Sequence, residues 1–150
     1  MSEHEKFMKY ALREAERAFD NGEMPVGCVI TFNNTLIAKS HNQVEKLKDA
    51  TAHSEILAIT SASEYLNSKY LPGCSMYVTL EPCPMCAGAL VNSKIDNLYF
   101  GAYDSKSGAC GSVFNITNSV HLNHKVNVYG GILDNESISL IKSFFSDKRE

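Results

Sequence analysis

Two short segments carry side chains that could bind a transition metal together. The first is His53-Ser54-Glu55 and the second is Pro82-Cys83-Pro84-Met85-Cys86. Each is weak alone, because a His-x-Glu arises readily by chance and Cys-x-x-Cys also occurs in redox proteins. Together they offer one imidazole, two thiols and one carboxylate, which is a set suited to metal-assisted hydrolysis.

Zn²⁺ is the metal that His53, Cys83 and Cys86 favour. Two cysteines three residues apart at a helix start place both sulfurs on one face, where the helix dipole favours thiolates. The two thiolates offset the charge of the metal. Three protein ligands leave the fourth tetrahedral position open to water, which is typical of a catalytic zinc site.

Glu55 is expected to act on that water without binding the metal. Residues two apart on a helix point ~200° away from each other. His53 and Glu55 therefore reach one point only if the metal lies over the N-terminus of their helix. From there the carboxylate could accept the proton of the water and return it to the substrate ring and the leaving amine.

Other interpretations of the cysteines stay open. Cys83 and Cys86 could form a redox pair, or a closed structural zinc site with Cys74, although Cys74 follows Pro72-Gly73 without partner spacing. Cys28 and Cys110 are expected to be small buried side chains or loop thiols. Five cysteines follow an acidic, polar N-terminus that is unlike a signal peptide, so we expect reduced thiols and a cytoplasmic protein.

Length and composition limit the class of protein. The chain has 150 residues, of which 44% are hydrophobic and 21% charged. This predicts one domain over residues 1–150 and excludes a disordered or collagen-like chain. No apolar run approaches the ~20 residues of a membrane span. The net charge of −3 does not suggest nucleic acid binding, so contact with RNA would depend on a local patch.

Helices and short strands must position these residues. Ser2 and Glu5 predict a capping box for a first helix that stops at Gly22, and Asn33-Asn34 predicts a tight hairpin. The apolar patterns predict further helices at 51–65, 84–91 and 137–145, and strands at 26–32, 35–38, 76–80, 98–101 and 126–129. Helices between short hydrophobic strands predict a sheet covered on both faces, in a three-layer α/β domain.

A His-x-Glu followed downstream by Pro-Cys-x-x-Cys is the signature of zinc deaminases. The sequence resembles the zinc-dependent cytidine and deoxycytidylate deaminase superfamily and, within it, the bacterial tRNA adenosine deaminases. The similarity runs along nearly the whole chain. It includes residues 24–27, 41–42, 51–56, 79–89, 100–102, 104, 108–112, 123–126 and 144–145.

The resemblance implies a three-layer α/β/α, cytidine deaminase-like fold with a mixed five-stranded sheet. It implies hydrolytic deamination of the wobble adenosine of a tRNA anticodon to inosine, by a homodimer with one Zn²⁺ in each subunit. His53, Cys83 and Cys86 match the zinc ligands and Glu55 matches the proton shuttle. Asn42 matches the asparagine that orients the base and ribose of the substrate.

Four further residues are expected near the substrate. Ser54 and Pro25 lie within the matching motifs, and Lys106 could reach a phosphate from its loop. Phe144 and Phe145 continue an apolar helical stripe that fits a core, but Phe145 could also stack on a flipped base.

Two alternative functions stay open. Related guanine deaminases share Pro84, where the tRNA deaminases more often have an apolar residue, so a deaminase of guanine or another free purine base or nucleoside is possible. A zinc-stabilised RNA-binding module without activity is the non-enzymatic alternative.

The sequence also departs from the family pattern at two other places. The family more often has alanine at Ser54, and the tail after Phe145 is short and balanced in charge.

Overall fold

The computed structural model of the chain describes residues 2–149. Its helices and strands are interspersed along the chain. They are α1 (Glu3–Asp20), β1 (Gly27–Phe32), β2 (Thr35–His41), α2 (Val44–Leu47), α3 (Ser54–Leu66), β3 (Cys74–Leu80), α4 (Pro84–Asn92), β4 (Asn97–Ala102), β5 (Asn127–Tyr129) and α5 (Asp134–Arg149). No helix in this described part is both long and apolar enough to cross a membrane.

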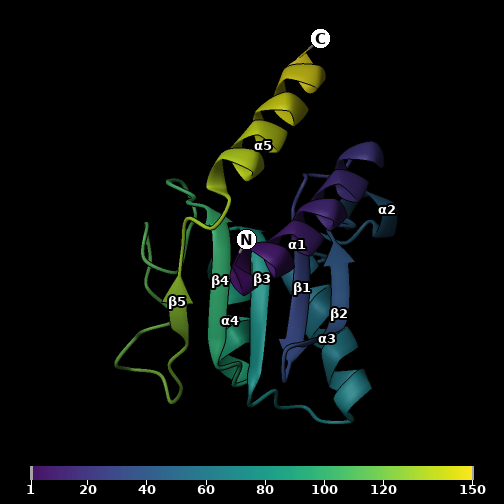
Figure 1. Ribbon diagram of the computed structural model, residues 1–150. Coiled ribbons are helices and arrows are strands. Elements are labelled where there is room, and N and C mark those ends of the chain that lie inside the picture. The colour runs from purple at the N-terminus through teal and green to yellow at the C-terminus, as the bar shows by residue number, and fades with distance from the viewer. Residues whose placement is uncertain (1, 150) are drawn as a thin grey trace.

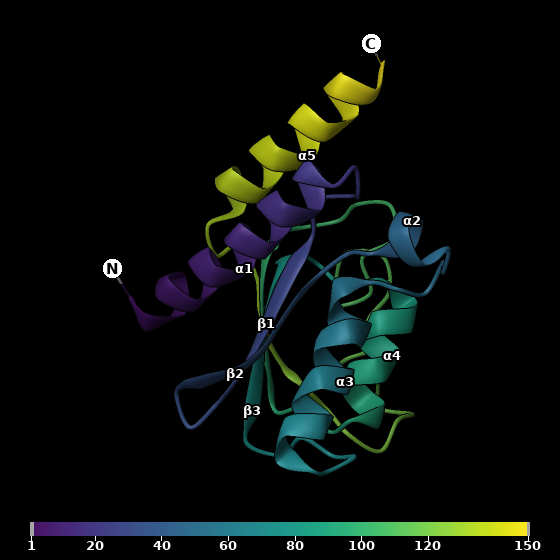
Figure 2. The same cartoon turned by 90° about the vertical axis from the view of Figure 1, so that its right-hand side faces the viewer.

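The five strands form one mixed sheet in the order β2-β1-β3-β4-β5. β1 is antiparallel to β2 and β3, whereas β3, β4 and β5 are parallel to one another. α1 and α5 cover one face of the sheet, and α3 and α4 lie side by side on the other (Figures 1 and 2). The predicted three-layer architecture and mixed five-stranded sheet are confirmed.

The hairpin between β1 and β2 forms as predicted. Asn33 and Asn34 have φ angles of 51° and 60°, the left-handed values that a two-residue turn of this kind requires. β2 continues to His41, three residues beyond the predicted end at Ala38. This extension carries the chain to Asn42, beside the start of α3.

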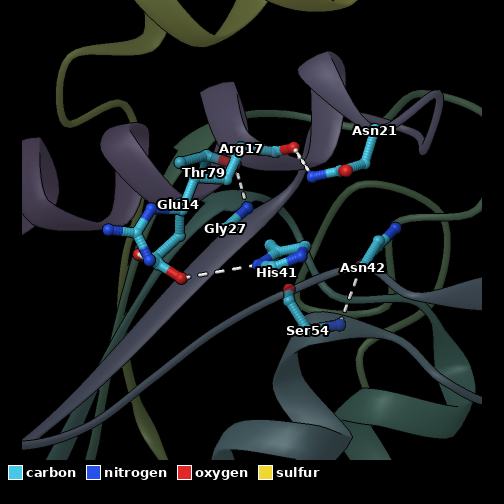
Figure 3. A network of polar contacts seen from close by, with 8 residues as sticks. All are labelled: Glu14, Arg17, Asn21, Gly27, His41, Asn42, Ser54 and Thr79. Atoms are coloured by element: carbon cyan, nitrogen blue, oxygen red, sulfur yellow. Dashed lines mark hydrogen bonds and ion pairs between the residues drawn. The ribbon is translucent and has the colours of Figure 1, made fainter.

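A close approach of α1 to β1 anchors this half of the sheet. Ser2 and Glu5 form the predicted capping box, and α1 buries one apolar face. A side chain at Gly27 would overlap the backbone of Ala11 and Ala15, so only glycine allows this approach. The Gly27 N–H donates to Thr79 Oγ1 at 3.1 Å, which ties β1 to β3 (Figure 3).

α4 begins at Pro84, as predicted, because proline lacks the N–H that would have no partner in a first helical turn. α3 begins at Ser54, three residues after the predicted start at Thr51, and His53 is its extended N-cap residue. α5 is longer than predicted at both ends. The N-termini of α3 and α4 lie next to each other beyond the carboxyl end of β3, because His53 and Cys83, their N-cap residues, are in contact (Figure 2).

Candidate metal centre

Three side chains from two helix starts converge on one point. His53 Nδ1 lies 3.7 Å from Cys83 Sγ and 3.6 Å from Cys86 Sγ. The ligand atoms all lie within 4.8 Å of one another, and within residues 2–149 no other such group of histidine, cysteine or acidic side chains is found. One nitrogen and two sulfurs are a donor set that Zn²⁺ prefers, so the residues fit the predicted metal.

The electrostatics of the two thiols favour metal binding. A hydrogen bond from Cys86, assisted by His53, lowers the pKa of Cys83 to about 4. Donation to Cys83, together with burial, raises the pKa of Cys86. Its hydrogen bond with Cys83 also raises the pKa of His53. In the protein without metal, the cluster therefore holds a thiolate and a proton that a bound cation would displace.

Glu55 lies beside this cluster and is 4% exposed. Burial raises the pKa of its carboxyl group. The carboxyl group lines a cavity of about 250 Å³ together with His53, Cys83 and Asn42. The structure thus brings Glu55 next to the candidate metal ligands, as the sequence predicts.

Ser54 lies next to Glu55 and outside the lining of the cavity. It is fully buried, and its hydroxyl donates to Glu55 Oε1 at 2.9 Å. It is not among the residues that line the cavity. The structure therefore shows a contact of Ser54 with Glu55, and its contact with substrate stays a prediction.

Asn42 connects β2 to α3. Its Oδ1 accepts the backbone N–H of Ser54 at 2.7 Å (Figure 3). The His53 side chain makes no cap hydrogen bond, so Asn42 supplies the cap from outside the helix. The imidazole of His53 is thereby left to face the two sulfurs, and the amide Nδ2 of Asn42 points away from Ser54.

The other predicted substrate residues lie outside this cavity. Pro25 is buried and is not part of the lining. Lys106 and Phe145 line a second, more open cleft of about 560 Å³. Met24, Leu80, Asp104 and Ser107 belong to both linings, so the cavity and the cleft adjoin.

Glu81 is a site residue that the sequence analysis left without a role. It is 2% exposed and lines the cavity. Its Oε1 accepts the N–H of Asp104 at 3.0 Å, and its Oε2 accepts the N–H groups of Cys110 and Ser112 at 3.1 Å each. Ser112 Oγ also donates to it. Glu81 thereby fixes the loop of residues 104–112, and its place next to Pro82-Cys83 was the available signal.

Glu23 was also missed. It is 2% exposed, lines the same cavity and accepts the backbone N–H groups of Glu45 and Lys46 at 3.0 and 2.9 Å. Its position immediately before the Met24-Pro25 motif was the only signal in the sequence. The two buried glutamates Glu23 and Glu81 thus each use a carboxylate to hold a segment that lines the cavity.

A fourth buried carboxylate, besides those of Glu55, Glu81 and Glu23, lies away from the cavity. Glu14 of α1 lies 3.5 Å from His41 Nδ1 and 3.5 Å from Arg17 Nη1 (Figure 3). Asn21 Nδ2 donates to the carbonyl of Arg17 at 2.7 Å, at the end of α1. These contacts join α1 to the end of β2, one residue before Asn42.

Comparison with known proteins agrees with the geometry. Residues 1–102 match the family model of the cytidine and deoxycytidylate deaminase zinc-binding region. The chain is 52% identical over 145 residues to a tRNA-specific adenosine deaminase of Aquifex aeolicus (strain VF5), and the match covers 97% of this chain and 95% of that protein.

Solved structures give the same result. A tRNA:A34 deaminase studied for A-to-I editing at the wobble position of transfer RNA superposes with a TM-score of 0.87 and 41% identity, over 90% of this chain and 98% of that one. A guanine deaminase from Nitrosomonas europaea, at 23% identity and a TM-score of 0.82 over 95% and 84% of the two chains, shares the fold alone. The chain therefore belongs to the cytidine and deoxycytidylate deaminase family and, within it, to the tRNA-specific adenosine deaminases.

Proposed function

We propose that this protein is a cytoplasmic zinc enzyme that hydrolyses the wobble adenosine of a tRNA anticodon to inosine and ammonia. The observation that carries the proposal is the convergence of His53, Cys83 and Cys86 beside Glu55, in a chain 52% identical to a tRNA-specific adenosine deaminase. Residues 1–150 would act as one deaminase domain, and the active species would be a homodimer.

The zinc ligands would be Nδ1 of His53 and the sulfurs of Cys83 and Cys86. Bound there, Zn²⁺ supplies a Lewis acid that activates water at neutral pH. Glu55 would accept one proton from the attacking water and deliver it to the ring, and would then pass the second proton of that water to the amine, which departs as ammonia. Burial suits Glu55 to this exchange, because it raises the pKa of the carboxyl and so favours the form that carries a proton.

The size of the cavity favours a single base as the reacting group. Its volume of about 250 Å³ lies below the ~300–1,000 Å³ of sites that enclose drug-sized ligands. Asn42 uses Oδ1 to cap α3, so its Nδ2 is the atom that would donate to the base or the ribose. An anticodon loop presents unpaired bases, and placing one of them here costs less than extruding a base from a duplex.

The adjoining cleft supports a polynucleotide substrate. Tyr103 and Phe145 are 61% and 45% exposed there, and Lys106 and Lys142 belong to the same lining. Aromatic side chains stack on unpaired bases and lysines neutralise phosphates. This local patch accounts for RNA binding by a chain with a net charge of −3. The free-purine alternative has Pro84 and a likeness in fold in its favour.

The test is nucleoside mass spectrometry of an anticodon stem-loop with a wobble adenosine after incubation with the zinc-loaded protein. Inosine from the wild-type protein, and none from a Glu55→Gln variant with the same zinc content, is the expected result. Free guanine and free adenosine are assayed in parallel. Xanthine from guanine without inosine from RNA would move the protein to the free-purine deaminases. RNA binding without any product would favour the non-enzymatic alternative.

The homodimer needs its own measurement. Light scattering of the purified protein during gel filtration should give a mass of twice 16.6 kDa. A mass of one chain under conditions in which inosine forms would contradict the dimer and leave the reaction unaffected.

A further inference from the structure

Residues 44–51 form a mostly exposed segment between two residues of the site. Asn42 precedes this segment, and His53 follows it after Ala52. At its base the Gln43 N–H donates to the Ala52 carbonyl at 3.0 Å, and Asn42 Oδ1 accepts the Ser54 N–H at 2.7 Å. The two ends of the 44–51 segment are therefore fixed at the site itself.

Within the segment the hydrogen bonds are local, among them those between backbone groups of its turns and those from the N–H and hydroxyl of Thr51 to Asp49. None of its residues is buried, and Leu47 is 49% exposed. α2 has four residues, and its N-cap residue Gln43 makes no side-chain cap hydrogen bond. A single helical turn is not stable alone in water, because nucleation fixes several dihedral angles for each hydrogen bond gained.

Glu23 supplies the missing contact from the turn between α1 and β1. Its Oε1 accepts the N–H of Glu45 at 3.0 Å, and its Oε2 accepts the N–H of Lys46 at 2.9 Å. Both donors lie in the first turn of α2, where N–H groups lack partners within the helix. Hydrogen bonds to a carboxylate are roughly twice as strong as those between neutral groups.

Resting on the proposed function, we infer that Glu23 is a positioning residue for substrate binding. Glu23, Val44 and Glu45 line the cavity together, so the carboxylate fixes the wall that it also helps to form. This part of the lining then keeps its shape, although Glu23 is not among the candidate metal ligands. Loss of this contact should weaken substrate binding and leave the chemical step intact.

The experiment compares Glu23→Gln with Glu14→Gln in the zinc-loaded protein. Both replace one oxygen of a buried carboxylate by NH₂, but Glu14 lies outside the cavity lining. The NH₂ that Glu23→Gln introduces cannot accept an N–H, so one of the two hydrogen bonds is lost. We expect hydrogen exchange in the 44–51 segment to rise roughly tenfold in Glu23→Gln alone, and KM for the stem-loop to rise roughly tenfold with kcat within about threefold.

A Glu23→Asp variant keeps the charge and shortens the side chain, and it should show the same two changes if Glu23→Gln does not fold. Unchanged exchange in the 44–51 segment, or a fall in kcat at constant KM, would overturn the inference. Hydrogen exchange does not depend on turnover. Absence of inosine from the wild-type protein would therefore refute the proposed function, while the exchange result still decides whether Glu23 holds the segment.

Discussion

The carboxamide of Asn42 accepts the backbone N–H of Ser54 at 2.7 Å and so joins the end of β2 to the first turn of α3. One side chain therefore caps the helix that presents His53 and Glu55, and also borders the cavity that they line. The position of α3 and the shape of the cavity are coupled at this residue.

Two substitutions of Asn42 separate the effect of its Oδ1, which caps α3, from that of its amide donor. Asn42→Asp keeps an acceptor for the Ser54 N–H but removes the amide donor, so it should retain zinc and thermal stability while losing most activity. Asn42→Ala removes both, and the lost cap should cost about 1 kcal/mol and weaken zinc binding as well. Chelator competition, thermal melts and inosine yield measure the three effects. Equal zinc affinity in the two variants would refute a capping role.

The hydroxyl of Ser54 should modulate the pH dependence of stability in metal-free protein. Burial raises the pKa of Glu55, whereas the Ser54 hydrogen bond opposes the rise. The stability that neutral Glu55 contributes is present below the ordinary pKa of a glutamate and is lost as pH rises through the raised value. Urea unfolding of chelator-treated protein at about pH 5 and about pH 8 should show the largest loss in Ser54→Ala, less in wild type and least in Glu55→Gln. Identical losses in the three proteins would contradict this account.

Alkylation should distinguish the cysteines once the metal is removed. The thiolate is the reactive form, and Cys83 has a pKa lowered to about 4 by the Cys86 hydrogen bond. Burial raises the pKa of Cys74 to about 11 and that of Cys110 to about 12. Iodoacetamide at neutral pH should therefore modify Cys83 first in chelator-treated protein, as peptide mass spectrometry would show. Zinc should protect it, and equal labelling of Cys74 would disprove the predicted order.

Phe144 and Phe145 should respond in opposite ways to alanine. Phe144 is 7% exposed and its ring packs against Phe19, so Phe144→Ala should destabilise the fold by about 3 kcal/mol. Phe145 is 45% exposed in the cleft, so Phe145→Ala should leave stability within about 0.5 kcal/mol. Loss of one stacked base should raise KM for the stem-loop roughly tenfold. Urea unfolding measures the free energy of unfolding, and steady-state kinetics measures KM. An unchanged KM would show that Phe145 does not contact the RNA.

Local chemistry explains which parts of the fold were predictable. Local features appear where they were predicted, because each acts within a few residues of the chain: the positive φ angles of Asn33-Asn34, the absent N–H of Pro84 and the capping box of Ser2. The start of α3 was placed three residues early because its cap comes from Asn42, on another element. α2 was missed for the same reason, since its support is the distant carboxylate of Glu23.

The residues of the site also fall into those that the sequence predicted and those that it did not. Spacing brought out His53, Glu55, Cys83 and Cys86, because metal ligands need particular residue types at particular intervals. Spacing does not reveal which side of a helix start faces a cavity, and Ser54 was therefore not distinguished from the residues that line it. Buried glutamates that hold loops, such as Glu81, carry no pattern of their own.

The pairing of Gln43 with Ala52 has a consequence for engineering. Because it closes the base of the 44–51 segment, we expect changes within residues 45–50 to leave Asn42 and His53 in place. If the segment contacts substrate as inferred above, reactivity and selectivity would be encoded in separable stretches of the chain. A library randomised over that stretch would sample new substrates on an unaltered reaction centre, so retargeting this deaminase is a problem of loop grafting.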